Sequence, residues 1–174
     1  MTRRLMDGLI IVTVLVGATH LWAQGMGGRK VVRPNQAGGM TGSVARGGAG
    51  PNGGAAMAGR GFATDGAGNG AGASAQAFRG PNGAQGARAG GWARQADGSF
   101  KRAGGGAVSG ANGSAATSGS MQRNADGTVN GSRNTQAQAA SGASYDGSTT
   151  YDSGSGVAHT GTCTNAAGQV VACR

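Results

Sequence analysis

An Asx-Gly dipeptide recurs at nearly constant spacing and limits the possible folds of this chain more than any other feature. Its Asn or Asp members are Asn82, Asp97, Asn112 and Asp126, and the steps between them differ by no more than a single position. Asn and Asp tolerate the left-handed backbone region and Gly adopts it freely, so such dipeptides are strong signals of tight turns between strands. The regular spacing therefore predicts a repeat in which short strands alternate with turns.

Further turn signals extend this pattern toward both ends of the chain. The tetrapeptide Gly-Pro-Asn-Gly occurs at 50–53 and again at 80–83, where proline presets the backbone angle of the first central turn residue. Two more Asp-Gly dipeptides indicate turns outside the regular spacing. The complete set of predicted turn residues is Asn52, Gly53, Asp65, Gly66, Asn82, Gly83, Asp97, Gly98, Asn112, Gly113, Asp126, Gly127, Asp146 and Gly147.

Large apolar side chains are too few for a conventional core. After Leu21 the sequence has no Leu and no Ile, and 39 of its 174 residues are Gly. Burial stabilises by roughly 25 cal/mol per Å², whereas ordering the backbone costs about 1–2 kcal/mol per residue. We therefore predict a mostly disordered, low-complexity chain with short β-hairpins or a thin all-β repeat, preceded by one N-terminal signal helix. Each repeat unit would supply two short strands, with the Arg residues outside and an inner seam of Phe78, Trp92, Phe100, Val108, Met121 and Val129.

Residues 1–23 have the pattern of a secretory signal peptide. Arg3 and Arg4 precede an apolar run from Leu9 to Ala18, and small Ala23 stands at the predicted cleavage position before Gln24. The run is shorter than the roughly 20 residues of a membrane-spanning helix, although an uncleaved anchor is the alternative. We expect an exported protein of the periplasm, outer surface or extracellular space that meets the membrane only through this segment.

Composition divides the remaining chain into four segments. We expect a basic, Gly-rich flexible segment (24–61), the turn repeat (62–129), a Ser/Gly-rich linker or degenerate repeat (130–158) and a hairpin tail (159–174). Cys163 and Cys173 are an even number of cysteines in an exported chain, so they predict a disulfide that closes the tail. Together with His159 they offer at most three metal ligands at no familiar spacing, so we expect no metal and no other cofactor.

Acid, base and nucleophile chemistry is scarce. The chain has no Glu, and of the Asp residues that follow the signal segment all but Asp152 directly precede Gly and are explained by turns. We therefore predict that the protein is not an enzyme and has no small-molecule substrate. Lys and Arg number 15 against six acidic residues, a formal charge of +9 that favours weak, salt-sensitive contacts with polyanions. Arg46-Gly47-Gly48 and Arg60-Gly61-Phe62 resemble fragments of nucleic-acid-binding boxes, but the signal peptide argues against nucleic acid as a partner.

Gly-Pro-Asn-Gly turns alternate with Ala-Asp-Gly turns behind a signal peptide and before a short Cys-containing tail. This arrangement, over residues 45–174, resembles uncharacterised exported Gly-rich repeat proteins of Gram-negative bacteria. The resemblance implies an envelope or extracellular location and brings no known activity. Small residues between tight turns are also similar in logic to curli and silk.

These observations together favour a structural role. We expect a non-catalytic protein of the cell envelope, extracellular matrix or surface adhesion. The alternative is a disordered cationic module that binds nucleic acid, acidic polysaccharide or lipid head groups. Self-association and anionic envelope polymers are the expected partners.

Overall fold

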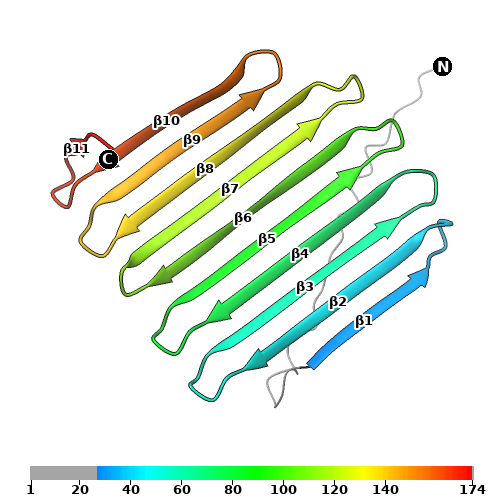
Figure 1. Ribbon diagram of the computed structural model, residues 1–174, viewed down its shortest axis with the longest axis horizontal. Helices are drawn as coiled ribbons and strands as arrows, with labels where there is room; N and C mark the ends of the chain where they lie inside the picture. Colours follow the sequence, from blue (N-terminus) through cyan, green and yellow to red (C-terminus); the bar gives the residue numbers. More distant parts are fainter. Residues whose placement is uncertain (1–26, 174) are drawn as a thin grey trace, which may run out of the picture.

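The computed structural model describes residues 27–173, and these residues form one antiparallel β-sheet. The strands lie in the sheet in chain order, so each strand pairs with its neighbours in sequence (Figure 1). The strands are β1 (Gly27–Pro34), β2 (Met40–Ala49), β3 (Ala55–Thr64), β4 (Gly70–Arg79), β5 (Gln85–Arg94), β6 (Phe100–Gly110), β7 (Gly113–Arg123), β8 (Val129–Ala139), β9 (Ser144–Asp152), β10 (Gly156–Thr164) and β11 (Val170–Val171).

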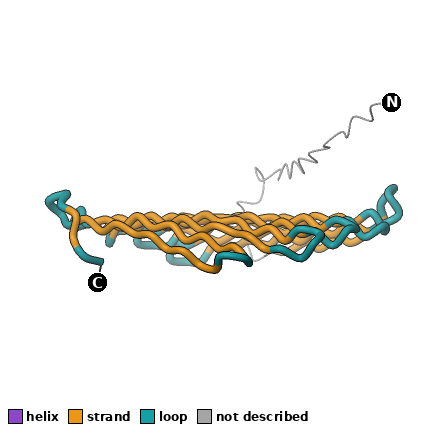
Figure 2. Tube along the Cα trace, turned by 90° about the horizontal axis from the view of Figure 1, so that it is seen from above, coloured by secondary structure: helices purple, strands orange, loops and turns teal. Residues whose placement is uncertain are grey.

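The sheet is a single layer with nothing from the described residues packed on either face. Seen from above, the strands form one thin, gently twisted band (Figure 2). Among residues 27–173 no hydrophobic side chain is buried, and even Phe62 and Trp92 are 40% and 38% exposed. Long ladders replace a core: β6 and β7, for example, pair from Phe100–Arg123 to Gly110–Gly113. These ladders satisfy the backbone donors and acceptors that a disordered chain would leave to water.

The prediction of a mostly disordered chain is therefore wrong. The estimate behind it treated burial of apolar side chains as the main source of order. It neglected a sheet in which every long strand is joined to the next by a short turn and held by backbone hydrogen bonds. The repeat unit also differs from expectation, because each repeat supplies one strand and one turn instead of two strands. The expected signal helix and the predicted cleavage site at Ala23 and Gln24 lie outside the described residues.

A glycine with positive φ marks each turn and sets the period. Five of these glycines follow one another at a constant interval: Gly38, Gly53, Gly68, Gly83 and Gly98. Their φ angles, together with that of Gly66, lie between 73° and 102°. In the turn after β5, Gly98 N–H donates to the Gln95 carbonyl and Gln95 N–H donates to the Ser99 carbonyl, each at 3.0 Å. This is a type I turn followed by a left-handed residue, a common hairpin connection that favours Gly at the fourth position.

Four of the predicted turn glycines occupy this left-handed position: Gly53, Gly83, Gly98 and Gly127. Gly113 also has a positive φ, of 132°, but it is the first residue of β7 after a shorter turn at Ala111 and Asn112. Asp65 and Gly66 begin the loop between β3 and β4, where Gly66 has positive φ as predicted, although the glycine in register with the period is Gly68.

The predicted turn at Asp146 and Gly147 is wrong. Both residues lie inside β9, where Asp146 is paired with Gln136 of β8 and Thr162 of β10. The turn of this region is at residues 139–143, with Gly142 at positive φ. A strand that passes straight through an Asp-Gly dipeptide shows that the dipeptide permits a turn without requiring one.

The segments expected to be irregular carry strands. Residues 27–61 contain β1, β2 and most of β3, and residues 130–158 contain most of β8, all of β9 and the start of β10. The tail is a short hairpin in which β11 pairs only with Cys163 and Thr164 of β10. The Cys163–Cys173 disulfide joins the end of the chain to β10, with a Cα–Cα distance of 5.4 Å.

Candidate functional site

The strand registers assign every strand residue to one of the two faces. Neighbouring residues in a strand point to opposite faces, and directly paired residues of adjacent strands point to the same face. Following the pairs from β1 to β10 therefore separates the side chains into two sets. Their chemistry differs sharply.

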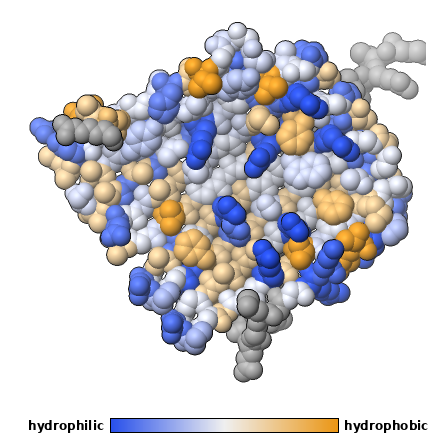
Figure 3. All heavy atoms as spheres, in the orientation of Figure 1, coloured by the Kyte–Doolittle hydropathy of each residue, from blue (hydrophilic) through white to orange (hydrophobic). Residues whose placement is uncertain are grey.

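One face, here the aromatic–cationic face, carries every aromatic side chain of residues 27–173. The whole chain has 15 Lys and Arg residues, and twelve remain in this range once Arg3, Arg4 and Arg174 are left out. Eight of those twelve lie on this face. Hydrophilic and apolar side chains are intermingled on the surface (Figure 3). The members are Phe62, Phe78, Trp92, Phe100, Tyr145, Tyr151, Lys30, Arg46, Arg60, Arg88, Arg94, Arg102, Arg123 and Arg133.

No carboxylate of the described strands lies on the aromatic–cationic face. Asp146 and Asp152 belong to the opposite face, and the other described Asp residues are in loops. The cations on this face therefore have no acidic partner beside them in the sheet. Their charge is available to an external anion.

One line of paired residues on this face crosses ten strands, and we call it the aromatic row. Large side chains in it are commonly separated by glycine on the strand between. Strands in a sheet lie about 4.8 Å apart, so side chains two strands apart, such as Phe62 and Trp92, are roughly 9.6 Å apart. In order from β1 to β10 the row is Val32, Gly42, Phe62, Gly72, Trp92, Arg102, Met121, Gly131, Tyr151 and Val157.

Phe62, Phe78 and Trp92 each lie over a glycine of a neighbouring strand. A Cβ added to Gly72 would come within 2.5 Å of Trp92 Nε1, and one added to Gly86 would come within 2.5 Å of Phe78 Cε1. Phe62 covers Gly42 in the same way. Each of these three rings therefore covers a neighbouring backbone and stays partly exposed to solvent. Such a ring is a platform for stacking.

The positions of the arginines differ from the sequence prediction, which placed them outside the seam of apolar residues. The six residues predicted for that seam do share one face, but Arg88, Arg94, Arg102 and Arg123 lie among them. Two of these guanidinium groups hold neighbouring loops together. Arg94 Nε donates to the Gly68 carbonyl at 3.2 Å, and Arg123 Nη2 donates to the Gly98 carbonyl at 2.9 Å.

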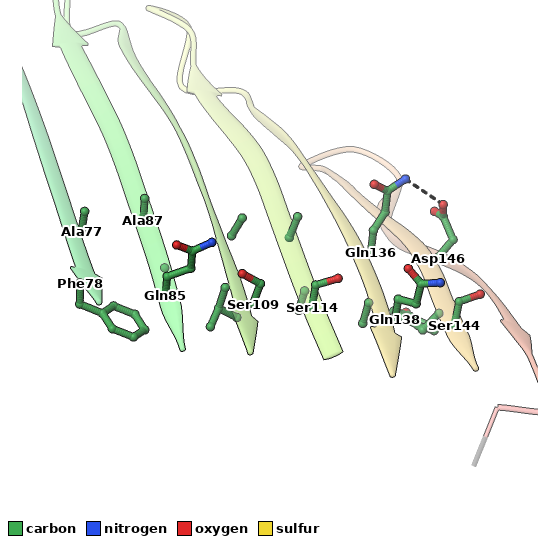
Figure 4. A pocket seen from close by; sticks show the side chains of 17 residues that line it. Ala77, Phe78, Gln85, Ala87, Ser109, Ser114, Gln136, Gln138, Ser144 and Asp146 are labelled. Carbon is green, nitrogen blue, oxygen red and sulfur yellow. Dashed lines mark hydrogen bonds between the residues drawn. The ribbon is translucent and has the colours of Figure 1, made fainter. Parts of the chain in front are cut away.

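The opposite face, here the small-residue face, consists mainly of Ala, Gly, Ser, Thr, Asn and Gln. Its β3–β6 part is dominated by Ala and Gly, whereas its β7–β10 part is dominated by polar residues. Near the turns that follow the even-numbered strands, a polar line runs from β5 to β9 beside a shallow hollow (Figure 4). Gln136 Nε2 donates to Asp146 Oδ2 there at 3.0 Å. The line itself is Gln85, Ser109, Ser114, Gln138 and Ser144.

Carboxylates in the loops serve the turns. The pKa of Asp97 is lowered from its ordinary value because Ser99 donates to it from its backbone N–H and from its hydroxyl. The Thr128 hydroxyl and backbone N–H lower the pKa of Asp126 in the same way. The pKa of Asp65 is lowered by the Asn69 amide and then by the backbone N–H of Ala67. Each of these groups is held in its charged form by hydrogen bonds of its own loop.

The side chains of His159, Cys163 and Cys173 are engaged with other groups of the chain. Cys163 and Cys173 are joined as a disulfide, and His159 Nδ1 lies 2.8 Å from Thr149 Oγ1 while its Nε2 lies 3.3 Å from Tyr145 Oη. Within residues 27–173 there is no cluster of His, Cys, Asp and Glu that could hold a metal ion. Nor does this part of the chain contain a helix long and apolar enough to span a membrane.

Comparisons with known proteins add no relative. The chain matches no family model, and neither a curated protein nor a solved structure is significantly similar to it. The resemblance to exported Gly-rich repeat proteins therefore stays a prediction. Sequence reasoning also missed the shared face of aromatic and cationic residues. The signal for it was the parity of positions within each strand, which becomes readable only once every turn is placed.

Proposed function

We propose that this chain is a non-catalytic, exported binding protein of the envelope or extracellular matrix whose aromatic–cationic face holds an acidic polysaccharide. The observation that carries the proposal is the placement of all six described aromatic residues and eight cations on one face without a carboxylate. Stacking rings and guanidinium groups are the two elements that bind extended anionic polymers. The opposite face has neither in comparable density.

The spacing of the rings favours a polymer with flat, repeated units. Phe62 and Trp92 are two strands apart in the aromatic row, at roughly 9.6 Å, a spacing on the scale of two sugar units in an extended chain. Both rings cover a glycine and remain partly exposed, which suits a sugar ring that lies flat on the sheet. Arg102 stands between Trp92 and Met121 in the same row, where a uronic carboxylate would meet a bidentate donor. The expected signal peptide supports an envelope polymer over nucleic acid.

The open geometry supports a binding function without catalysis. The hollow beside the polar line is shallow, and Gln and Ser side chains are its main polar lining. His159 is the single histidine of residues 27–173, and its ring nitrogens lie beside hydroxyl groups of Thr149 and Tyr145. General acid–base chemistry needs titratable groups that converge on one substrate position, and the described surface has none in that arrangement.

Binding of the full chain to polymannuronate, an acidic β-linked polysaccharide, tests the proposal. The variant Arg60→Gln/Arg88→Gln/Arg102→Gln removes three cations from the aromatic–cationic face, and none of these three side chains is hydrogen-bonded to a loop in the manner of Arg94. The matched control Arg29→Gln/Arg33→Gln/Lys101→Gln removes three cations from the small-residue face. Exposed ion pairs contribute about 0.2–1 kcal/mol each, so the loss of three should weaken binding by roughly 3-fold to 150-fold in the first variant and by much less in the control.

Two results would contradict this assignment. Equal losses in both variants would mean that only total charge matters and that the chain binds polyanions without a defined face. Tighter, face-dependent binding of single-stranded oligothymidine than of polymannuronate would identify nucleic acid as the polymer. In either case affinity should fall as salt rises, so the comparison between the two triple variants is the informative measurement.

A further inference from the structure

The small-residue face contains a smooth patch that no other part of the described chain covers. On this face of β3–β6, Ala and Gly fill all positions except Met57, Lys101 and a terminal line of Arg79, Gln85 and Ser109. We call this area the alanine patch. No charged side chain stands in its interior. Because most of its side chains end at Cβ, two such surfaces can approach closely over their whole area.

A single exposed sheet is an incomplete arrangement, because stable domains bury at least one face of a sheet against a second layer. Among the described residues no hydrophobic side chain is buried. The aromatic–cationic face repels another copy through its cations. The alanine patch, by contrast, gains from losing contact with water and has no interior charge that stacking would desolvate.

One edge of the sheet is guarded against growth. Edge strand β1 carries Arg29, Lys30, Arg33 and Pro34, the residue types that discourage pairing with another strand. At the other edge β11 pairs only with Cys163 and Thr164 of β10, where the Cys163–Cys173 disulfide holds it in place. Continuous growth through the edges would need both edge strands and is therefore blocked at β1, whereas association through a face does not use the edges.

We propose that a second copy of this chain covers the alanine patch, so that two sheets stack face to face as a symmetric pair. The two-fold axis lies between the two sheets, runs parallel to the strands and passes between β4 and β5. It places β4 of one copy over β5 of the other and keeps each row of residues in line. Since Ala75 and Ala89 are paired in register, Ala75 then faces Ala89 of the partner subunit. In the same arrangement Arg79 faces Gln85 of the partner subunit, and Lys101 faces Ala63 of the partner subunit, so no like charges meet.

The patch is large enough for a stable pair. Strands about 4.8 Å apart with a rise of about 3.4 Å per residue make four ten-residue strands cover roughly 650 Å². Two copies would thus bury roughly 1,300 Å², within the ~1,200–2,000 Å² of a typical stable interface. Stacking leaves both aromatic–cationic faces outward, so the assembly ends at two copies. The pairing itself does not depend on polymer binding.

Sedimentation of the full, oxidised chain without polymer tests this proposal. The unaltered protein should sediment at twice the mass of one chain at tens of micromolar. Ala89→Glu places a carboxylate at the centre of the dry interface and should give single chains. The matched control Ser148→Glu adds the same charge in the same row of the sheet but outside the patch. It should leave the pair intact.

Other results would overturn the proposal. These are single chains for the unaltered protein, a pair that survives Ala89→Glu, and large assemblies that Ala89→Glu does not change.

Single chains that bind neutral phosphatidylcholine vesicles, with binding lost in Ala89→Glu, would assign the patch to a lipid surface instead. If Ala89→Glu loses its β-strand circular dichroism, oxidative cross-linking decides. Chains with Ala75→Cys should cross-link to chains with Ala89→Cys but not to chains with Ser148→Cys, and absence of the first product contradicts the stacking.

Discussion

The two faces of the sheet share one backbone but carry side chains suited to different tasks. Along β5, Arg88, Trp92 and Arg94 point to one side, while Ala87 and Ala89 point to the other. In a globular domain one face of a sheet supplies the core and the other meets water. Here neither face supplies a core within the described chain, so the alternation separates a surface with binding groups from a surface with almost no side chains. Alternation alone can therefore build two surfaces from a chain poor in large residues.

Glycines that lie under aromatic rings differ from Gly59, which lies on the small-residue face. On the aromatic–cationic face Gly72 makes room for the Trp92 ring, and Gly147 leaves space for the Tyr145 hydroxyl. On the small-residue face Gly59 has no such neighbour: a Cβ there would come no closer than 3.8 Å to the Val44 carbonyl oxygen. The glycines beside the rings are fixed by packing, whereas Gly59 keeps the surface flat.

The largest expected effect removes the stacking platforms. Phe62→Ala/Trp92→Ala deletes two rings from the aromatic row; in complexes with single-stranded nucleic acid each stacked ring contributes roughly 1–3 kcal/mol, and we expect the same scale here. We expect the affinity for polymannuronate to fall by roughly 100-fold, measured by titration of the full chain. Met57→Ala removes a side chain from the small-residue face that is comparably exposed in a single sheet. If it weakens binding as much, the two faces are equivalent and the comparison fails.

A smaller effect separates the two kinds of glycine. Gly72→Ala forces the Trp92 ring from its place, and overpacking of this kind costs about 1–3 kcal/mol. Gly59→Ala adds a methyl group without a clash and reduces the freedom of the unfolded chain, so it should stabilise by about 0.5–1 kcal/mol. Urea unfolding measures both free energies, and Trp92 fluorescence reports whether the ring has moved. A stabilising Gly72→Ala with unchanged Trp92 fluorescence would refute the packing of the ring on glycine.

The smallest expected effect concerns the turns that join the strands. The pKa values of Asp65, Asp97 and Asp126 lie below their ordinary value of 3.8 in the folded chain. The unfolded chain therefore binds protons more readily than the folded chain. The stability that these carboxylates contribute is fully present above their unfolded pKa and is lost as pH falls through their pKa values in the folded chain. The thermal midpoint should be flat from neutral pH to about 5 and fall below about 4.

Asp97→Asn/Asp126→Asn should flatten part of that fall, because an amide does not titrate. Substitution at Asp146, which lies in β9 and not in a turn, provides the matched control. An unchanged slope in Asp97→Asn/Asp126→Asn would show that the loop carboxylates do not cause the acid sensitivity.

Part of this architecture was readable from the sequence. The spacing of Asn82, Asp97, Asn112 and Asp126 located the central turns, because Asx-Gly is a local signal whose conformation depends on little else. Glycines such as Gly38, Gly68 and Gly142 also mark turns but follow Ala or Ser, so the Asx-Gly pattern does not include them.

Other features depend on the sheet as a whole. Asp146-Gly147 has the Asx-Gly pattern of a turn but lies inside β9, where its Gly is required by the Tyr145 ring. Side chains alternate between the two faces along a strand, so the face of each residue depends on where its strand begins. Because some turns were placed wrongly from the sequence, the position of Arg among the aromatic residues could not be predicted.

Hydroxyl-radical footprinting of Ala89→Glu chains, in which the alanine patch is expected to be uncovered, with and without polymannuronate, tests the central claim most directly. Phe62, Trp92 and Tyr151 lie on the aromatic–cationic face, and Met57 lies on the small-residue face with a comparable exposed fraction. The account predicts that polymer lowers the oxidation rate of the three aromatic residues and leaves that of Met57 unchanged. Equal protection of all four residues, or protection of Met57 alone, would contradict a binding function confined to one face of the sheet.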